Sequence, residues 1–185
     1  MLHNDIEEIL VSQDEIKTII KTLGATLTED YVNKNPLFVG LLKGCVPFIS
    51  DLLKELDFML EVDFMDVSSY HGGLESSGDV KIDKDLSTAV KGRHVILAED
   101  IVDSGRTIQA IRSMLLYRGA ASVRVVTLLD KPKGRVVQLQ PDYIGRTIPD
   151  AFVVGYGLDY KEFYRNLPYV GTLKPSVYQT EDEES

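Results

Sequence analysis

The stretch HVILAEDIVDSGRT, residues 94–107, decides the fold of this chain. Residues 94–98 are mostly apolar and predict a buried strand that ends at two adjacent carboxylates, Glu99 and Asp100. Asp103 and the small, hydroxyl-bearing residues after it predict a tight loop that begins a helix. Free backbone N–H groups at a helix start bind anions, and clustered carboxylates meet metal ions or sugar hydroxyls. One loop is therefore expected to hold a phosphorylated sugar.

Helical and strand periodicities alternate on both sides of this stretch. Ser12 and Glu15 form a capping-box pattern before a helix expected over residues 13–27, and Pro47 suits the first turn of a second helix. Gly119 is placed to end a third helix over residues 107–118. Apolar runs predict strands at residues 37–42, 60–67, 80–82, 94–98 and 122–129. This order predicts an α/β fold with a mostly parallel twisted sheet flanked by helices.

Polar residues follow four of the predicted strands at the point where each strand ends. These residues are Lys43, Ser69, Glu99 and Lys131. Ligands of parallel α/β sheets bind at the carboxyl ends of the strands. We therefore expect four loops to converge on one rim of the sheet.

Two segments interrupt the alternation of strands and helices. Residues 68–79 are polar and glycine-rich, and a segment of this length is typical of a lid or of an unstructured insertion rather than of a simple connector. After Lys131, five prolines divide the chain into short segments. We expect one domain over residues 1–185, with a core at about 12–131 and a small cap at about 132–178 that the extreme N-terminus joins. The acidic end, residues 180–185, is expected to be disordered.

Composition and charge narrow the classes of function. The net charge of -9 opposes non-specific nucleic-acid binding, which needs a basic surface. Cys45 is the only cysteine, so no disulfide forms within the chain, and we expect this residue to pack rather than react. No apolar run approaches the roughly 18 residues of a membrane-spanning helix. We therefore expect a cytoplasmic protein without nucleic-acid or membrane partners.

Five segments, taken in order, resemble the type I phosphoribosyltransferases. They are Leu42–Gly44, Ser69–Tyr70, Glu99–Thr107, Leu129–Lys131 and Pro149–Arg165. The third segment is strong for the whole superfamily, and the fifth resembles the 6-oxopurine branch, the hypoxanthine(-guanine) phosphoribosyltransferases of bacterial type. The resemblance implies a Mg²⁺-dependent reaction of purine salvage. Hypoxanthine or guanine reacts with phosphoribosyl pyrophosphate to give IMP or GMP and pyrophosphate.

The resemblance assigns the central stretch to the sugar, its phosphate and the metal. The implied ligands of the 5′-phosphate are the residues of one loop: Asp103, Ser104, Gly105, Arg106 and Thr107. Glu99 and Asp100 match the acidic pair that meets the ribose hydroxyls and Mg²⁺ in this family. Asp103 also matches the family's general base, which accepts the imidazole proton of the purine.

The other segments are assigned to pyrophosphate and the purine base. The implied pyrophosphate ligands are Lys43, Gly44, Ser69, Tyr70 and Arg165, and the Leu42–Lys43 peptide is often cis in this family. The implied purine contacts are Lys131, Phe152, Val153 and Asp159. Lys131 would donate to the purine 6-oxygen, which explains a preference for 6-oxopurines over adenine. Phe152 would stack on the purine, and Asp159 would approach a second Mg²⁺ through water.

Other interpretations of the same residues stay open. Asp103 or Ser104 fits a simple helix cap, Lys131 fits a surface lysine, and Phe152 fits a residue of a buried strand. A rival function on the same fold is a regulator that binds nucleotide and RNA without catalysis, although the negative charge opposes it. The sequence does not rank hypoxanthine, guanine and xanthine. The resemblance implies a homodimer or a homotetramer.

Overall fold

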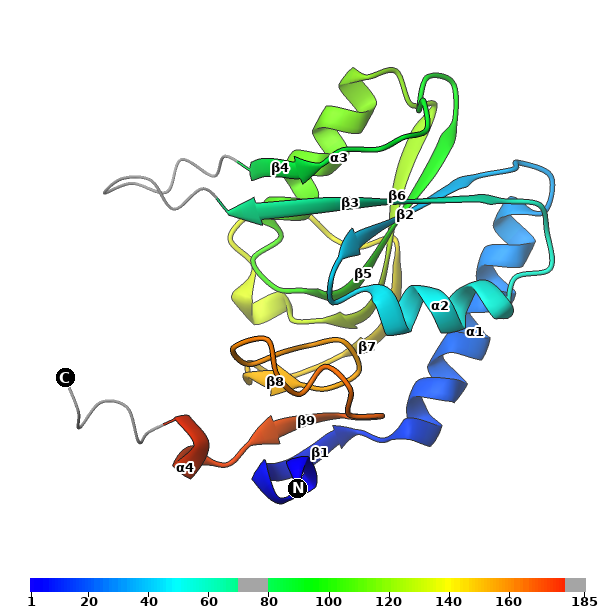
Figure 1. Ribbon diagram of the computed structural model, residues 1–185. Coiled ribbons are helices and arrows are strands. Elements are labelled where there is room, and N and C mark those ends of the chain that lie inside the picture. Colours follow the sequence, from blue (N-terminus) through cyan, green and yellow to red (C-terminus); the bar gives the residue numbers. More distant parts are fainter. Residues whose placement is uncertain (70–79, 179–185) are drawn as a thin grey trace.

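A six-stranded sheet forms the centre of the protein, and helices cover both of its faces (Figure 1). The computed structural model describes residues 1–69 and 80–178. The strand order is β4-β3-β2-β5-β6-β7. The bounds are β2 Leu37–Leu42, β3 Glu61–Ser69, β4 Val80–Lys84, β5 His94–Val102, β6 Ser122–Asp130 and β7 Tyr143–Thr147. All strands of this sheet are parallel except β4, which pairs antiparallel with β3. The predicted mostly parallel α/β sheet is confirmed.

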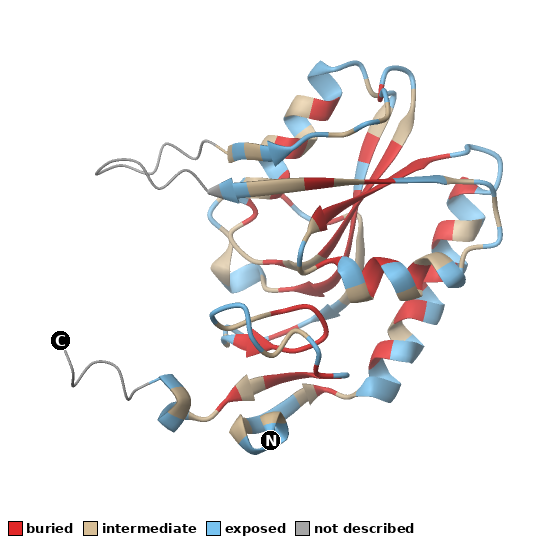
Figure 2. Ribbon diagram, viewed as in Figure 1, coloured by how far each residue is buried: buried red, intermediate tan, exposed pale blue. Residues whose placement is uncertain are grey.

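Side chains of the central strands alternate between the two faces of the sheet. On β5, Val95 and Leu97 pack with α3, Arg106–Tyr117, while Ile96 and Ala98 pack with α1 and α2 on the other face. The bounds of these two helices are Gln13–Tyr31 and Val46–Lys54. Figure 2 shows buried residues along the central strands and on the helix sides that face them. Because both faces are covered, the central strands are apolar throughout.

A smaller antiparallel sheet packs below the first one in Figure 1. Its order is β1-β9-β8, with bounds Ile6–Val11, Val170–Leu173 and Val153–Val154. Val153, Tyr156 and Val170 belong to the same buried cluster as the inner faces of α1 and α2. The described residues also form three short helices: η1 Leu2–Asp5, η2 Pro132–Gly134 and α4 Pro175–Tyr178. Among the described residues, none of the helices has the length and apolar character needed to cross a membrane.

Strands β1, β7 and β9 were not predicted from the sequence, and β8 was foreseen only in the alternative that placed Phe152 in a buried strand. β1 exposes three of its residues in a row, so it lacks the alternation that marks a half-buried strand. β7 is an edge strand whose five residues are all at least partly exposed. Because β7 pairs in parallel with β6, residues 143–147 extend the larger sheet. The boundary between core and cap expected at residue 131 therefore lies too early in the chain.

Helix and strand ends agree with the expected signals, with one instructive exception. The Ser12 hydroxyl accepts from the Glu15 N–H and the Glu15 carboxylate accepts from the Ser12 N–H, so the capping box is present. Gly119 follows α3 with a φ of +89°, as a helix-ending glycine does. The exception is β5, which was expected to end at residue 98 and continues to Val102 because its pairing with β6 persists to that point. Glu99 and Asp100 thus lie inside the strand rather than after it.

Some expected features fall outside the described residues. These are Tyr70, the greater part of the expected lid at 68–79, and the acidic end at 180–185. Ser69 is the last residue of β3.

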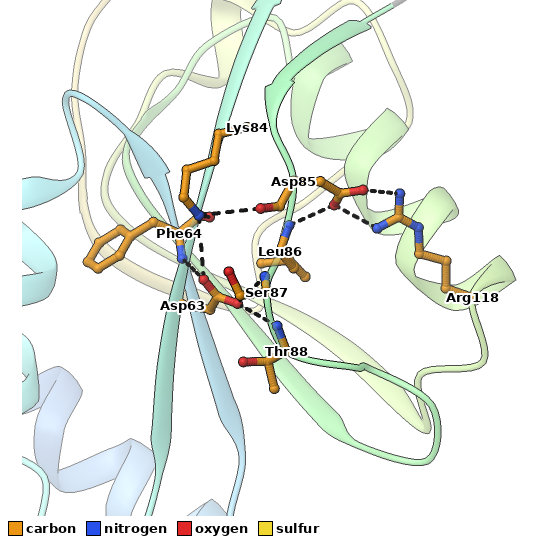
Figure 3. A network of polar contacts seen from close by, with 8 residues as sticks. All are labelled: Asp63, Phe64, Lys84, Asp85, Leu86, Ser87, Thr88 and Arg118. Carbon is orange, nitrogen blue, oxygen red and sulfur yellow. Dashed lines mark hydrogen bonds and ion pairs between the residues drawn. The ribbon is translucent and has the colours of Figure 1, made fainter.

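A buried carboxylate fixes the chain after β4 against β3 (Figure 3). Asp63 of β3 is 8% exposed. Its carboxylate accepts three backbone N–H groups at 2.8–2.9 Å, from Phe64, Ser87 and Thr88. Burial opposes ionisation of Asp63, but these amide hydrogen bonds outweigh it and lower the pKa of the carboxyl group below its usual value. The charged form of Asp63 therefore stabilises the fold.

Replacing this carboxylate is expected to destabilise the protein in a pH-dependent way. The pKa of Asp63 is lower in the folded state, so its contribution is present above the unfolded value of about 3.9 and is lost as the pH falls through the folded value. Asp63→Asn is expected to lower the free energy of unfolding by about 1–3 kcal/mol at pH 7, because amide donors lose their charged acceptor. The deficit should shrink below about pH 4. Urea unfolding at a series of pH values measures both quantities.

The matched control is Asp14→Asn, which removes an exposed carboxylate that pairs with Lys17 at 3.0 Å. Its effect is expected to stay within about 0.5 kcal/mol. A deficit for the Asp63 variant that stays constant down to pH 3 would show that the charge of Asp63 does not stabilise the fold.

Candidate active site

A cavity of about 350 Å³ lies at the carboxyl ends of β2 and β5. Its wall combines the end of β2 and the turn after it, the second half of β5 with the loop that follows, and Arg165 from the chain after β8. The predicted site residues in this wall are Lys43, Gly44, Glu99, Asp100, Asp103, Ser104, Gly105, Thr107 and Arg165. The structure therefore brings together residues from three of the five segments. Arg106, Lys131, Phe152, Val153 and Asp159 do not line this cavity.

The loop between β5 and α3 presents the start of a helix to the cavity. The N-cap of α3 is Gly105, whose φ of +78° lies in the left-handed region that favours glycine, and no side chain caps the helix. The Ser104 hydroxyl lies 3.4 Å from the Arg106 nitrogen, which is long for a hydrogen bond. Neither Asp103 nor Ser104 is the N-cap residue of α3, and the Ser104 hydroxyl makes only this long contact with the start of the helix. The first turn of α3 instead leaves backbone N–H groups and a helix dipole beside the cavity.

The two adjacent acids on β5 lie deep in the wall. Glu99 is 8% exposed, and its burial, together with the Asp100 charge, raises its pKa well above the usual range. Burial also raises the pKa of Asp100. A Cβ atom on Gly44 would lie 1.8 Å from Asp100 Oδ2, so only glycine lets the turn after β2 pack directly on this carboxylate. The sequence motif Lys43–Gly44 thus covers the acidic pair.

The chemistry of these acids suits a divalent cation. Mg²⁺ binds oxygen atoms and is usually held by one or two carboxylates, with waters and substrate phosphates completing its shell. Glu99 and Asp100 supply two such carboxylates in one wall, where a cation would offset the cost of burying their charge. Within residues 1–69 and 80–178, no group of three or more His, Cys, Asp or Glu side chains is placed to hold a metal. Glu99, Asp100 and Asp159 therefore do not form a closed site made of protein alone.

Two cations flank the cavity on the side of the turn after β2. The Leu42–Lys43 peptide is cis, as the resemblance implied. Lys43 Nζ lies 2.8 Å from Glu162 Oε2, and Arg165 lies 3.1 Å from the same carboxylate and 3.0 Å from Asp159. Arg165 also donates to the Gly157 carbonyl, while its Nε atom is buried without a hydrogen-bond partner in the described structure. Both cations that were predicted to bind pyrophosphate thus share one internal carboxylate.

The contact between this turn and the later chain depends on another glycine. Gly157 has a φ of +101°, and a Cβ atom there would lie 2.0 Å from the Gly44 carbonyl oxygen. The sequence did not indicate the roles of Gly157 and Glu162, because both act through contacts with residues more than one hundred positions away. The GYG pattern at residues 155–157 was a signal, but without the fold it does not show which backbone approaches it.

A second cluster lies on the other side of Asp103. Lys131 Nζ is 2.7 Å from Asp103 Oδ2 and 3.6 Å from Asp150, and the lysine side chain is only 12% exposed. Phe152 is 58% exposed and meets Tyr160 edge to face at 5.9 Å between ring centroids. Lys131 is therefore not an ordinary surface lysine, and Phe152 is not a buried strand residue. Val153, in contrast, is buried in β8.

The remaining predicted site residues have simpler positions. Arg106 is the exposed first residue of α3. Cys45 is fully buried, and burial raises the pKa of its thiol, so the expectation that it packs is confirmed.

Comparison with known proteins identifies the family. The family model described as phosphoribosyl transferase domain matches residues 8–161. A hypoxanthine-guanine phosphoribosyltransferase of Streptococcus pneumoniae strain R6 is 58% identical over 178 residues, which is 96% of this chain and 99% of the relative. The protein of that name from Lactococcus lactis is also 58% identical, over 96% of each chain. The crystal structure of a hypoxanthine phosphoribosyltransferase from Staphylococcus aureus has a TM-score of 0.93 and 52% identity, and covers 96% of both chains.

The two relatives and the crystal structure match nearly the whole chain, including the segments that line the cavity. The chain belongs to the phosphoribosyltransferase family, in the branch of the hypoxanthine-guanine phosphoribosyltransferases.

Proposed function

We propose that this protein transfers a phosphoribosyl group from phosphoribosyl pyrophosphate to hypoxanthine or guanine, which yields IMP or GMP and pyrophosphate. The position of Asp103 is the observation that supports this most directly. Asp103 lines the cavity together with the helix start, and its carboxylate contacts Lys131 at 2.7 Å. One residue therefore joins a phosphate-binding loop to a cation suited to an oxopurine. A regulator that binds nucleotide and RNA without catalysis would not need one residue that contacts both the loop and the lysine.

The loop after β5 is proposed to hold the sugar phosphate. The backbone N–H groups of residues 103–107 and the hydroxyls of Ser104 and Thr107 are suited to a 5′-phosphate. The dipole of α3 adds roughly 0.3–1 kcal/mol at an exposed helix start. Glu99 and Asp100 are suited to accept hydrogen bonds from the ribose hydroxyls. Holding the sugar at both ends fixes the anomeric carbon, and positioning of this kind is a large part of catalysis by transferases.

Lys43, Gly44 and Arg165 are proposed to hold the pyrophosphate. Negative charge grows on this group as its bond to the anomeric carbon breaks, so nearby cations stabilise the transition state more than the ground state. Lys43 and Arg165 are paired with Glu162 in the structure, and the pyrophosphate oxygens would replace that carboxylate. Ser69 and Tyr70 are proposed to meet the pyrophosphate as well.

The purine is proposed to bind beside Lys131 and Phe152. Lys131 donates to the 6-oxygen, Phe152 stacks on the ring, and the backbone of Val153 and Asp159 reads the ring edge. The ion pair of Lys131 with Asp150 supports this, because Asp150 is two residues from Phe152. Asp103 accepts the imidazole proton as the purine nitrogen bonds to the anomeric carbon. An aspartate is a weak base, but this proton becomes more acidic as the nitrogen forms its new bond.

We further propose Mg²⁺ as the cofactor, a homodimer or homotetramer as the assembly, and the cytoplasm as the location. Glu99 and Asp100 would hold one ion on the ribose side, and Asp159 would hold the water shell of a second ion near the pyrophosphate. The metal supplies positive charge that neutralises the leaving pyrophosphate.

A steady-state assay tests the proposed function. The protein is expected to form nucleotide from phosphoribosyl pyrophosphate with hypoxanthine and with guanine, to do so at least a hundredfold faster than with adenine, and to lose activity when EDTA removes Mg²⁺. Adenine carries an amino donor where Lys131 needs an acceptor, so the lysine would stay unpaired. Xanthine is included as a fourth base. Absence of product with all four bases would overturn the proposal.

Replacing Asp103 tests its role as general base. Asp103→Asn is expected to lower kcat with hypoxanthine by about 10²–10⁴-fold, because the amide does not accept the purine proton. The KM for phosphoribosyl pyrophosphate should change little. Asp150→Asn is the matched control, since it removes the other carboxylate beside Lys131 and should leave kcat within about threefold. Near-normal turnover by the Asp103 variant would refute the general-base role.

Replacing Lys131 tests the contact with the 6-oxygen. Lys131→Gln is expected to raise the KM for hypoxanthine by about 10–100-fold, since a hydrogen bond to a charged group contributes about 1.5–3 kcal/mol. The KM for phosphoribosyl pyrophosphate should stay within about threefold. Lys133→Gln, an exposed lysine of the same segment, is the control and should behave like the parent protein. Equal changes in both KM values would argue against a purine-specific role.

A further inference from the structure

Arg135 lies behind the anion-binding loop in a buried position that sequence analysis did not single out. Its side chain is 12% exposed, and it forms an ion pair with Asp130, which is 7% exposed, at the end of β6. Its guanidinium also donates to three backbone carbonyls: Asp103 from Nε at 2.8 Å, Val102 from Nη2 at 3.1 Å, and Leu139 from Nη1. A planar guanidinium has five donors in a fixed geometry, so it can serve four acceptors at once, which a lysine cannot.

The neighbours of Arg135 hold the same loop. The N–H of Val136 donates to the Ser104 carbonyl at 3.1 Å, and the N–H of Lys131 donates to the Val102 carbonyl at 3.0 Å. The carbonyls of three consecutive residues, 102–104, are thus bound by the segment 131–136. A Cβ atom on Gly105 would lie 2.8 Å from Arg135 Cδ, so the arginine stem also packs against the helix start.

Because these contacts fix the direction of the carbonyl groups, they also fix the direction of the N–H groups in the same peptides. In a planar trans peptide the N–H points away from the C=O. Because the carbonyls of Asp103 and Ser104 point toward the segment 131–136, the N–H groups of Ser104 and Gly105 point away from it. Ser104 and Gly105 line the cavity, and Arg135 does not. The N–H groups that the loop offers to an anion are therefore oriented by contacts on its far side.

We propose that Arg135, with Asp130 as its counterion, is a positioning residue that orients the backbone donors of the 5′-phosphate loop. This inference rests on the proposed function and adds to it a residue that touches no substrate. A buried ion pair adds little stability over a well-packed apolar pair, so stability alone does not account for this arrangement. Lys131 belongs to the same segment, so the contacts of Arg135 connect the lysine proposed to bind the purine with the loop proposed to bind the phosphate.

The variant Arg135→Lys keeps the charge and removes the planar set of donors. It is expected to raise the KM for phosphoribosyl pyrophosphate at least tenfold and to leave the KM for hypoxanthine within threefold. The Kd for ribose 5-phosphate, measured by calorimetry, should rise in parallel. The matched control is Arg124→Lys, because Arg124 pairs with Asp142 at 2.5 Å through the same chemistry, without touching the cavity. A fall in the melting temperature of Arg124→Lys is compatible with the proposal, but both KM values of this variant should match those of the parent protein.

A lower melting temperature for Arg135→Lys with an unchanged KM for phosphoribosyl pyrophosphate would show a purely structural role and overturn the proposal. If this variant does not fold, Asp130→Asn is measured instead, since it keeps the arginine and removes the charge of its counterion. A KM for phosphoribosyl pyrophosphate raised at least threefold supports the proposal, and a smaller change refutes it.

The test separates this inference from the proposed function. If the parent protein makes no nucleotide but binds ribose 5-phosphate, the proposed function fails and the Kd comparison still decides the role of Arg135. If the parent protein does not bind ribose 5-phosphate or phosphoribosyl pyrophosphate, both proposals fail.

Discussion

The parallel pairing of β2, β5 and β6 is the constraint on which the rest of the structure depends. Gly40 pairs with Ala98, and Val102 pairs with Asp130, so all three strands end at one edge of the sheet. Lys43, Asp103 and Lys131 are far apart in the sequence but begin the loops at that edge. A shift of one residue in either pairing would exchange the two faces of a strand and move its apolar side chains into the wrong layer. The burial of both faces therefore fixes the register, and the register fixes the relative positions of the site residues.

Much of the larger sheet and part of the site could be predicted because their signals are local. Capping residues, apolar periodicity and the acidic stretch after residue 98 each act within a few positions of the chain. The edge strands β1 and β7 escaped prediction because their exposed residues lack such periodicity, and the end of β5 depends on pairing with β6. The roles of Arg135 and Glu162 also escaped prediction. Both depend on contacts between segments that only the complete fold brings together.

The site also shows how an acidic protein can accommodate a polyphosphate. The chain carries a net charge of -9, yet cations gather around the cavity and behind its loop. Each of these cations has an internal carboxylate: Lys43 with Glu162, Arg165 with Asp159 and Glu162, Lys131 with Asp103, and Arg135 with Asp130. Pairs whose carboxylate is partly exposed can exchange it for a ligand oxygen at small cost, whereas the pair of Arg135 with the buried Asp130 cannot. The exposure of the carboxylate thus separates the two groups, since Asp103 is 47% exposed beside Lys131, whereas Asp130 is 7% exposed beside Arg135.

The pairing of β1 with β9 has a consequence for the synthesis of the protein. Ile6 pairs with Leu173, so the smaller sheet joins segments from nearly opposite ends of the described chain. On the ribosome, β1 emerges early and has no partner strand until β9 has been translated. The larger sheet can assemble in the meantime, because β2–β7 are complete before β9 appears. A nascent chain therefore carries an unpaired strand until residues 170–173 have been translated. Slow translation between β1 and β9 would prolong the time during which that strand can pair with another chain.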